Sequence, residues 1–450
     1  MISASLADAV QSFADALFMP WVVGLLLGVG LFMTLRLRVV QLRRFVDACR
    51  VTFVRRGTGT TGALTPFQAF MTALAASIGT GNIAGVATAI VSGGPGALFW
   101  IWVYGFVAMA IKFGEAVLGV TFRETRAGTL LSGPMYYLRD GLRSPFLAWL
   151  FALVAAIAAL TTTPFTQPNS MALVLNTVVG IPKLVSGIVI AVLTWLVIIG
   201  GIKSIGRAAE KLSPLKVALY FIGGLIVIFV NRSRMSSVFE MIFDGAFSMN
   251  AVAGGSLGMF VAMRYGIARG IYANEAGYGT AAVAYGTAQS AQPVQQGLNA
   301  VMEVFIVSFV TSTISAMTIL LTGVWQSGTT SSAAVAAAFN SAMPGVGGYV
   351  VAFCVFLFGY TTLIGWAYYG EQFFEYILGL KVTTPYRWIY CLLIPFGAMG
   401  PVNLVWAWGD LMNALQVFPN LIGVVGLSGL VAKAANERLR AEPPSTPSQP

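Results

Sequence analysis

The segment Ala75-Ala76-Ser77-Ile78-Gly79-Thr80-Gly81-Asn82-Ile83-Ala84-Gly85 interrupts a long apolar run with two glycines only two positions apart. A glycine costs about 1 kcal/mol relative to alanine inside a helix, so this pair favours local unwinding. Unwound backbone at membrane depth is tolerated only where protein, water, an ion or a solute satisfies its N–H and C=O groups. The segment therefore predicts a spanning helix that is broken beside a cavity.

The composition places that helix in a membrane protein. The chain has 450 residues, of which 57% are hydrophobic and 9% charged, and its mean hydropathy is +0.80. A soluble domain typically carries about 25% charged residues, so this chain could not maintain a water-soluble surface. The net charge of +10 is interpreted as the excess of Lys and Arg in cytoplasmic loops. No nucleic-acid partner is expected.

The hydropathy pattern predicts an all-α polytopic membrane protein with about eleven transmembrane helices, since each needs roughly 20 apolar residues. The predicted segments lie near 17–37, 66–92, 96–120, 146–176, 184–202, 214–230, 247–272, 297–323, 347–376, 386–405 and 411–432. The ten segments after the first form two sets of five. Because five is odd, the second set is inverted relative to the first, as in many secondary transporters.

The predicted organisation follows from this count. It comprises an N-terminal helix with a basic loop (1–60), a first five-helix repeat (61–232), a second, inverted repeat (245–433) and a disordered cytoplasmic tail (434–450). Arginines crowd the loop after the first helix, which places the N-terminus outside and the C-terminus in the cytoplasm of a bacterial inner membrane. Lys203, Lys211 and Lys216 then also fall on the cytoplasmic side.

The second half also opens with a glycine-interrupted helix, at Gly254 and Gly255. Two facing breaks expose half-helix N-termini, which are partly positive, and C-terminal carbonyls, which are partly negative. A small zwitterion matches that pair of ends, and leftover carbonyls can coordinate Na⁺. Close packing of small residues is the alternative explanation for such glycines, and it stays open here.

The residue types favour Na⁺ over a proton as the coupling ion. Proton coupling usually needs an ionisable group at membrane depth. The carboxylates lie near helix ends or in loops, with Glu115, Glu303, Glu371 and Asp410 closest to the interior, and the chain has no His. Hydroxyl and amide oxygens are plentiful at the predicted depth and suit a hard cation. No cluster of His, Cys or paired carboxylates suggests an enzyme.

Several strings follow one another in an order that is specific to one family. Among them are Pro66 to Ala69, Gly79 to Ile90, Gly93 to Ala97, Gly133 to Tyr137, Arg264 to Gly270, Asn274 to Gly277, Pro293 to Gly297 and Tyr368 to Glu371. On these strings, about residues 15–432 resemble the alanine or glycine:cation symporter family. The resemblance implies a leucine-transporter-like fold, in which one extra helix precedes a ten-helix core.

The resemblance also implies the binding residues. The substrate pocket is expected at Thr80, Gly81, Asn82, Gln167, Gly254, Gly255 and Trp366, and sodium at the carbonyls of Ala75 and Ile78 and the hydroxyls of Thr361 and Thr362. The indole of Trp366 in a cramped pocket favours small side chains. Pro164 and Pro168 depart from the family pattern and are predicted to displace Gln167 by kinking its helix. The stretch 274–277 is interpreted as a cytoplasmic gate or linker beyond the second broken helix.

The expected function is sodium-coupled symport of small neutral amino acids, alanine or glycine, into the cell by alternating access. The expected partners are the amino acid, Na⁺ as coupling ion and membrane lipid, with no other cofactor. A proton-coupled transporter of the same fold and a sensor that binds an amino acid without transporting it are the alternatives. The choice among small amino acids and the oligomeric state are not predicted.

Overall fold

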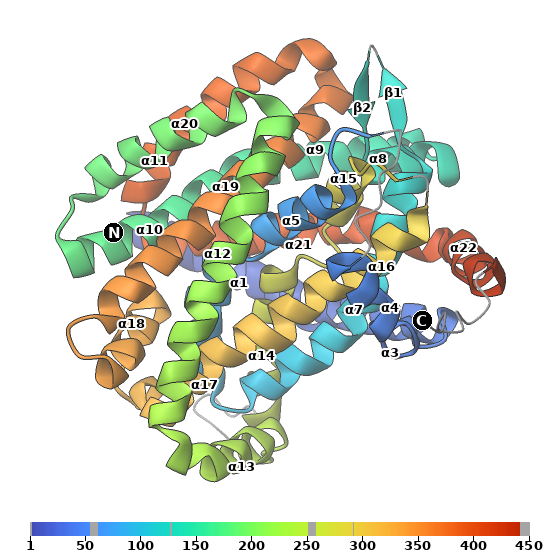
Figure 1. Ribbon diagram of the computed structural model, residues 1–450. Coiled ribbons are helices and arrows are strands. Elements are labelled where there is room, and N and C mark those ends of the chain that lie inside the picture. The colour runs from blue at the N-terminus through green and yellow to red at the C-terminus, as the bar shows by residue number, and fades with distance from the viewer. Residues whose placement is uncertain (1, 55–61, 127, 251–257, 291, 442–450) are drawn as a thin grey trace, which may run out of the picture.

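The computed structural model describes residues 2–54, 62–126, 128–250, 258–290 and 292–441, and nearly all of them are helical. Figure 1 shows the helices packed into one bundle. A short hairpin of β1 (Glu124–Arg126) and β2 (Thr129–Leu131) projects from one end. The predicted all-α fold class is confirmed.

The N-terminal part is a long helical rod followed by two short helices. It comprises α1 (Ile2–Leu17), the π-helical turn η1 (Phe18–Val22), α2 (Val23–Arg36), α3 (Val40–Arg43) and α4 (Phe45–Phe53). The rod packs against α7 and α21 of the bundle.

The first half of the bundle begins after a capping box, in which the Thr65 hydroxyl accepts from the Gln68 N–H and the Gln68 side chain accepts from the Thr65 N–H. This arrangement satisfies two free donors at a helix start. Its helices are α5 (Pro66–Ser77), η2 (Thr80–Asn82), α6 (Ala84–Gly93), α7 (Ala97–Thr121), α8 (Pro134–Tyr136), η3 (Tyr137–Gly141), α9 (Pro145–Thr161), α10 (Thr163–Val179), α11 (Lys183–Ile198) and α12 (Gly201–Val230).

The second half begins with short helices at the surface, and its helices α14 and α15 are separated by an irregular stretch at 275–279. Its elements are η4 (Arg232–Arg234), α13 (Met235–Ala246), α14 (Gly258–Asn274), α15 (Thr280–Gly286), α16 (Pro293–Phe305), η5 (Ile306–Thr311), α17 (Ser312–Thr322), η6 (Val324–Gln326), α18 (Ser331–Ala342), α19 (Gly347–Leu378), η7 (Leu380–Val382), α20 (Thr383–Met399), α21 (Val402–Gly426) and α22 (Ser428–Ala441).

Five helical stretches are long and apolar enough to cross a bilayer. They are Ala97–Thr121, Pro145–Val179, Gly201–Val230, Pro293–Thr322 and Gly347–Leu378. Two bent pairs bring the number to seven: α5 with η2 and α6, at 62°, and α21 with α22, at 53°. The predicted count of eleven is therefore not confirmed by length and composition, although helix covers most of each predicted segment in the described part of the chain.

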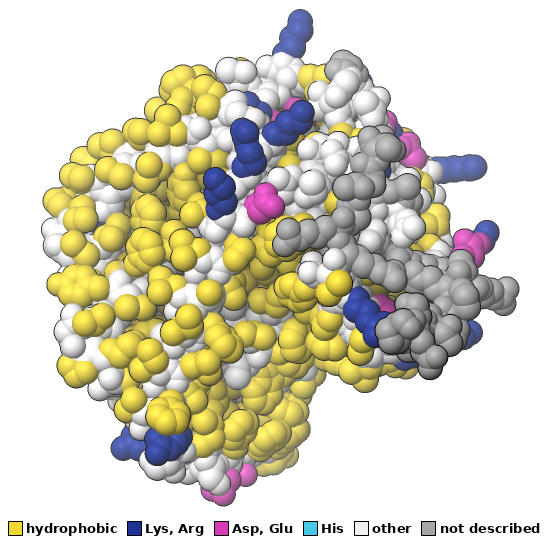
Figure 2. Space-filling view, in the orientation of Figure 1, with side chains coloured by type: hydrophobic (Ala, Val, Ile, Leu, Met, Phe, Trp, Pro, Cys, Tyr) yellow, Lys and Arg dark blue, Asp and Glu magenta, His cyan; other side chains and the backbone are white. Residues whose placement is uncertain are grey.

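The outer surface fits a bilayer. Figure 2 shows a broad hydrophobic face, with Lys and Arg side chains gathered toward its upper end and a smaller group at the lower end. Large apolar side chains on α11 and α12 remain exposed, among them Leu196, Ile222 and Phe229. Exposed apolar area of this extent marks a surface that lies against another molecule or a membrane.

Two predicted boundaries differ from the structure. The helix predicted at 214–230 begins at Gly201, because one side of the polar stretch, with Ile205 and Ala209, is buried against the bundle. The tail predicted as disordered from 434 is helical to Ala441, and Ala434 and Ala435 pack against the hydrophobic core.

Candidate functional site

The first interrupted span breaks where the sequence predicts. α5 ends at Ser77, Ile78 and Gly79 leave the helix, and α6 resumes at Ala84 after the single turn η2. The freed backbone groups find side-chain partners. The Ser77 carbonyl accepts from Asn82 Nδ2 at 3.0 Å, and the Asn82 carbonyl accepts from Ser315 Oγ at 2.6 Å. Such pairing is required where backbone leaves a helix at membrane depth.

Two glycines make this break possible because other groups come very close to them. A Cβ on Gly81 would lie 2.5 Å from the ring of Tyr272, and a Cβ on Gly79 would lie 2.7 Å from Thr362 Oγ1. Neither separation is compatible with a side chain. The glycine pair therefore lets α14 and α19 approach the broken backbone directly.

The second break lies at residues 275–279. α14 ends at Asn274 and α15 starts at Thr280, while Glu275, Gly277 and Gly279 have φ values of 56°, 95° and 81°. These left-handed conformations suit glycine and cost a residue such as Glu free energy. The predicted break at Gly254 and Gly255 lies outside the described residues. The stretch 274–277, interpreted as a cytoplasmic gate or linker, connects α14 to α15, and its Glu275 also lines the cavity described below.

Buried side chains stabilise the irregular backbone of the second break. The Glu115 carboxylate accepts from the N–H groups of Gly277 and Gly279 at 3.0 and 3.2 Å, and from Asn420 Nδ2 at 2.7 Å. Lys112 Nζ donates to the Asn274 carbonyl and to Glu303 Oε1, each at 2.6 Å. Charged partners of this kind compensate for the backbone bonds that the helix has given up.

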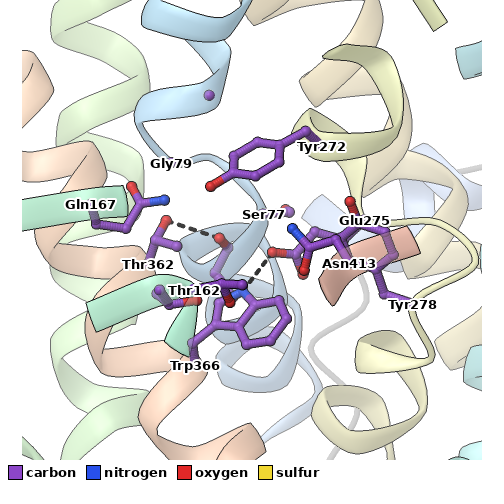
Figure 3. Close-up of a pocket in the computed structure, with 13 residues that line it drawn as sticks. Ser77, Gly79, Thr162, Gln167, Tyr272, Glu275, Tyr278, Thr362, Trp366 and Asn413 are labelled. Atoms are coloured by element: carbon purple, nitrogen blue, oxygen red, sulfur yellow. Dashed lines mark hydrogen bonds between the residues drawn. The ribbon is translucent and has the colours of Figure 1, made fainter. Parts of the chain in front are cut away.

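A small cavity lies where the two breaks meet. Its lining is Ala76, Ser77, Gly79, Gly81, Thr162, Thr163, Gln167, Tyr272, Glu275, Tyr278, Thr362, Trp366 and Asn413. The cavity has a volume of about 20 Å³, which is room for about one water molecule. Figure 3 shows Gln167 and Thr362 on one side of the cavity and Glu275 and Asn413 on the other. The cavity must widen to admit even a small amino acid.

The polar wall is largely organised by hydrogen bonds between helices. Gln167 Oε1 accepts from the N–H and the hydroxyl of Thr80, both at 3.0 Å. Trp366 Nε1 donates to Glu275 Oε1 at 2.6 Å, as Figure 3 also shows. Tyr272 Oη donates to Thr166 Oγ1 at 3.0 Å. Each of these bonds connects two different segments of the bundle at the level of the cavity.

The predicted substrate residues are only partly brought together at this cavity. Gly81, Gln167 and Trp366 line it, and their role in binding stays a prediction. Thr80 contacts Gln167 behind the wall. Asn82 points elsewhere: its amide donates to the Ser77 carbonyl and its oxygen accepts from Thr311. Sequence reasoning missed Glu275, although Gly277-Tyr278-Gly279 repeats the spacing of Gly79-Thr80-Gly81 and could have signalled it.

The prolines do not displace Gln167 from the break. Pro164 stands in the first turn of α10, where the missing N–H costs nothing, and Pro168 lies inside the same helix. α9 and α10 still run as one span, Pro145–Val179. The Gln167 side chain reaches Thr80 from this span.

The predicted sodium ligands also converge, but a lysine contacts three of them. Lys216 Nζ donates to the carbonyls of Ala75 and Ile78 at 3.1 and 2.6 Å and to Thr361 Oγ1 at 2.5 Å. The fourth group, Thr362 Oγ1, donates to the Ala76 carbonyl at 2.8 Å. The prediction that Lys216 faces the cytoplasm is wrong, since its side chain is fully buried.

The premise that all carboxylates lie near helix ends or in loops is also wrong. Glu115, Glu275 and Glu303 are each at most 5% exposed. Glu303 pairs with the buried Lys112, and Glu275 reaches the cavity wall. Ionisable residues at this depth are by default functional candidates. The arrangement can therefore hold a small polar solute between an acidic wall and an amide wall, beside a group of cation-binding oxygens.

The sequence is similar to that of known membrane transporters along nearly its whole length. The model of the sodium:alanine symporter family matches residues 3–443. The sodium/alanine symporter AgcS of Methanococcus maripaludis is 39% identical over 96% of this chain and 97% of its own length. A protein named as a probable sodium/glutamine symporter, GlnT of Bacillus subtilis, is 33% identical over 95% of this chain and 89% of its own.

Solved structures share the fold at low identity. A manganese transporter of Eremococcus coleocola superposes with a TM-score of 0.54 at 15% identity and covers 85% of this chain and 82% of its own. MhsT in complex with L-phenylalanine superposes with a TM-score of 0.52 at 13% identity and covers 83% of this chain and all of its own. Likeness at this identity shows the fold, which is leucine-transporter-like.

Proposed function

This chain belongs to the sodium:alanine symporter family and is a multi-pass membrane protein that moves amino acids with a cation, and from that premise we propose that it carries a small neutral amino acid, alanine or glycine, into the cell together with Na⁺. Because the family is one of transporters, the chain is not an enzyme.

The observation that carries this proposal is the cavity between the two breaks. The carboxylate of Glu275 faces it from one side and the amide of Gln167 from the other. An amino acid carries a positive and a negative end, and each end needs a partner of opposite polarity when it leaves water. We assign the substrate ammonium to the side of Glu275, and its carboxylate to Gln167 and the partly positive start of η2 and α6.

The size of the cavity supports a small substrate. Trp366, Tyr272 and Tyr278 line it, so three aromatic rings limit the space beside the α-carbon of a bound amino acid. A close-packed apolar wall discriminates by about 1–3 kcal/mol for each methylene that does not fit. The name of AgcS as a sodium/alanine symporter agrees with this preference, whereas that of GlnT shows that relatives also differ in the substrate they are named for.

Sodium is proposed as the coupling ion on the chemistry of the oxygens beside the cavity. The carbonyls of Ala75 and Ile78 and the hydroxyls of Thr361 and Thr362 are hard ligands without net charge. Proton coupling is the second candidate, and one observation favours it: the Glu275 carboxylate, a proton-accepting group, lies in the cavity wall.

We further propose that the transporter works by alternating access in a bacterial inner membrane, with its N-terminus outside and its C-terminus in the cytoplasm. The two repeats, 61–232 and 245–433, would then move against each other around the fixed cavity. A larger hollow beside α1, of about 400 Å³, is lined by residues that include Gln11, Arg264 and Asp410. We assign it as the outer approach to the site.

Uptake by proteoliposomes tests the proposal. Purified protein is reconstituted and offered labelled glycine, alanine, serine, glutamine and phenylalanine, with an inward gradient of Na⁺ or of K⁺. We expect accumulation of alanine and glycine above the outside concentration with Na⁺ alone, and little uptake of phenylalanine. Equal accumulation with K⁺ and a proton gradient would favour the second candidate, and binding without accumulation would leave a sensor.

A further inference from the structure

The arginine-rich stretch after the first helix folds into the short helices α3 and α4, which lie at one edge of the bundle beside α7 and α16 (Figure 1). Residues 36–54 hold five arginines and a single carboxylate, Asp47. Asp47 is paired with Arg44. The other arginines are exposed and form no ion pair with any residue that the structure describes: Arg36, Arg38, Arg43 and Arg50.

Two of these arginines meet at one turn. Arg38 and Val39 reverse the chain between α2 and α3, at φ values of 54° and 57°. Arg43 Nη1 donates to the Arg38 carbonyl at 3.4 Å, so the Arg43 guanidinium lies against the turn that carries Arg38. Positive charges held this close repel one another unless an anion lies between them. Guanidinium groups bind phosphate oxygens well, since they can donate two parallel hydrogen bonds to them.

The inner face of α4 is already occupied by the protein. Thr52 Oγ1 donates to Asn299 Oδ1 on α16 at 2.9 Å. The Phe45 ring packs edge-on against Phe305, with 4.9 Å between the ring centroids. Ala48, between them on the same face, is fully buried. Only the outer face of α3 and α4 is left for another molecule.

This outer face mixes arginines with large apolar side chains. Leu42, Val46 and Phe53 are 66%, 62% and 54% exposed, and their helical spacing puts them on the face that carries Arg43 and Arg50. A soluble anion would give the arginines a partner but would leave the apolar side chains in water. At a bilayer interface the apolar side chains lie among acyl chains while the guanidinium groups stay at the level of the headgroups.

The apolar part of the face continues a stripe on α2. Leu31, Phe32 and Leu35 are 54%, 42% and 65% exposed, and they directly precede Arg36 at the end of that helix. Exposed apolar side chains on a helix of a membrane protein lie against lipid. Arg36 therefore stands where a lipid-facing stripe ends, at the depth where headgroups begin.

We propose that Arg36, Arg38, Arg43 and Arg50 bind the headgroup phosphate of an anionic phospholipid, whose acyl chains lie against the outer faces of α2 and α4. Clusters of basic residues next to a spanning helix attract anionic lipids electrostatically. A zwitterionic headgroup brings an ammonium of its own, which the arginines repel, so an anionic lipid is preferred. The proposal is independent of the substrate and of the coupling ion.

The proposed lipid site is joined to the second break through α16. Phe45 on α4 contacts Phe305 on α16, and two residues earlier Glu303 pairs with the buried Lys112. Lys112 Nζ donates to the carbonyl of Asn274, where α14 ends. A lipid that holds α4 against α16 therefore stabilises the folded bundle, as does any ligand that binds only the folded state.

The test measures the binding of fluorescent phosphatidylglycerol and phosphatidylcholine to the purified full chain in an uncharged detergent. We expect phosphatidylglycerol to bind about tenfold or more tightly than phosphatidylcholine, and to raise the Tm of the protein by roughly 3 °C or more. The triple variant Arg36→Gln/Arg43→Gln/Arg50→Gln should lose both effects, because each basic residue near anionic lipid contributes roughly fivefold to binding.

A second triple variant is the matched control. Lys203→Gln/Arg207→Gln/Lys211→Gln removes three exposed charges from α12 and should keep the preference for phosphatidylglycerol. An equal loss of preference in the two triple variants overturns the proposal, since binding would then follow net charge alone. Equal binding of the two lipids by the unaltered protein also overturns it.

Two further measurements complete the test. Soluble glycerol phosphate should displace phosphatidylglycerol only at concentrations about tenfold or more above those of the lipid, because it lacks acyl chains. Displacement at equal concentrations overturns a lipid as the occupant. If the triple variant does not fold, Arg50→Gln alone decides: we expect phosphatidylglycerol to bind roughly fivefold more weakly, and an unchanged affinity overturns the proposal.

Discussion

The indole N–H of Trp366 on α19 donates to the carboxylate of Glu275 at 2.6 Å. Glu275 stands at the break between α14 and α15 in the left-handed region, at φ 56°. A strained residue of this kind persists only where its surroundings fix it, and such residues cluster at functional sites. The bond therefore connects the break between α14 and α15 to the wall of the cavity, and Trp366 both fills space and orients the acidic group.

Trp366→Ala is expected to change which amino acid is carried. Removal of the indole enlarges the cavity beside the substrate, and one added methylene in such a pocket is worth about 1–3 kcal/mol. We expect uptake of leucine or methionine relative to alanine to rise by about tenfold or more. Competition of these amino acids against labelled alanine measures the ratio.

Trp388→Ala is the matched control for Trp366→Ala. It removes an indole that is 51% exposed on α20, away from the cavity. Its selectivity should equal that of the unaltered protein. If both variants shift selectivity alike, the assignment of Trp366 to the substrate wall is incorrect.

Gly81→Ala is expected to slow transport strongly. The added methyl group would lie 2.5 Å from the Tyr272 ring, and overpacking of this kind typically costs about 1–3 kcal/mol. We expect the initial rate of uptake to fall about tenfold or more at normal expression. Gly85→Ala, where the nearest atom is the Arg269 Cδ at 3.5 Å, should retain most of the rate. Equal rates in the two variants would contradict the close approach at the first break.

The ion pair of Arg269 and Asp410 is expected to close the outer approach. The guanidinium donates to both carboxylate oxygens at 3.2 and 3.1 Å. Three residues further on, the same two helices carry Tyr272 and Asn413, which line the cavity. Loss of one partner of a largely buried pair costs about 3–5 kcal/mol, so Arg269→Asp and Asp410→Arg should each lower uptake about tenfold or more.

The exchanged double variant, Arg269→Asp with Asp410→Arg, separates this pairing from general damage. It should recover part of the rate, because the two charges can pair again in reversed positions. A double variant no more active than the two single variants would show that the pair does not act as a closing contact.

Glu115 is expected to stabilise the second break. Its carboxylate accepts from two backbone N–H groups and one amide. Glu115→Leu leaves these buried donors without a partner, at about 1–3 kcal/mol each, whereas Glu115→Gln keeps an accepting oxygen. In thermal unfolding of the purified protein, we expect a fall in Tm of roughly 5 °C or more for Leu and a clearly smaller fall for Gln. Equal falls would contradict the role of the accepting oxygen.

The sequence predicted the fold and the first break, because long apolar runs and a close glycine pair are local signals. The second break was missed. The adjacent Gly254 and Gly255 drew attention, while Gly277 and Gly279 are separated by a tyrosine and follow a charged residue. Their importance depends on Glu115, more than 150 positions earlier in the chain, and tertiary pairing of that kind has no local signature.

Two side chains show why the rest of the site could not be predicted. The helix predicted at 214–230 placed Lys216 close to its start, but the helix starts at Gly201 and accommodates Pro214 in its interior. Asn82 lies in the broken segment, yet its amide turns to the nearby Ser77 carbonyl. The direction of a side chain at an irregular turn follows from local hydrogen bonding, which the order of residues does not specify.

The most direct test of the central claim is an experimental density map of the protein with L-alanine and Na⁺, compared with a map recorded without alanine. The account predicts additional density between Gly79–Gly81 and the side chains of Glu275 and Trp366, with both spans interrupted. Density for alanine only at another place, or spans that run without interruption through residues 78–83 and 275–279, would contradict it.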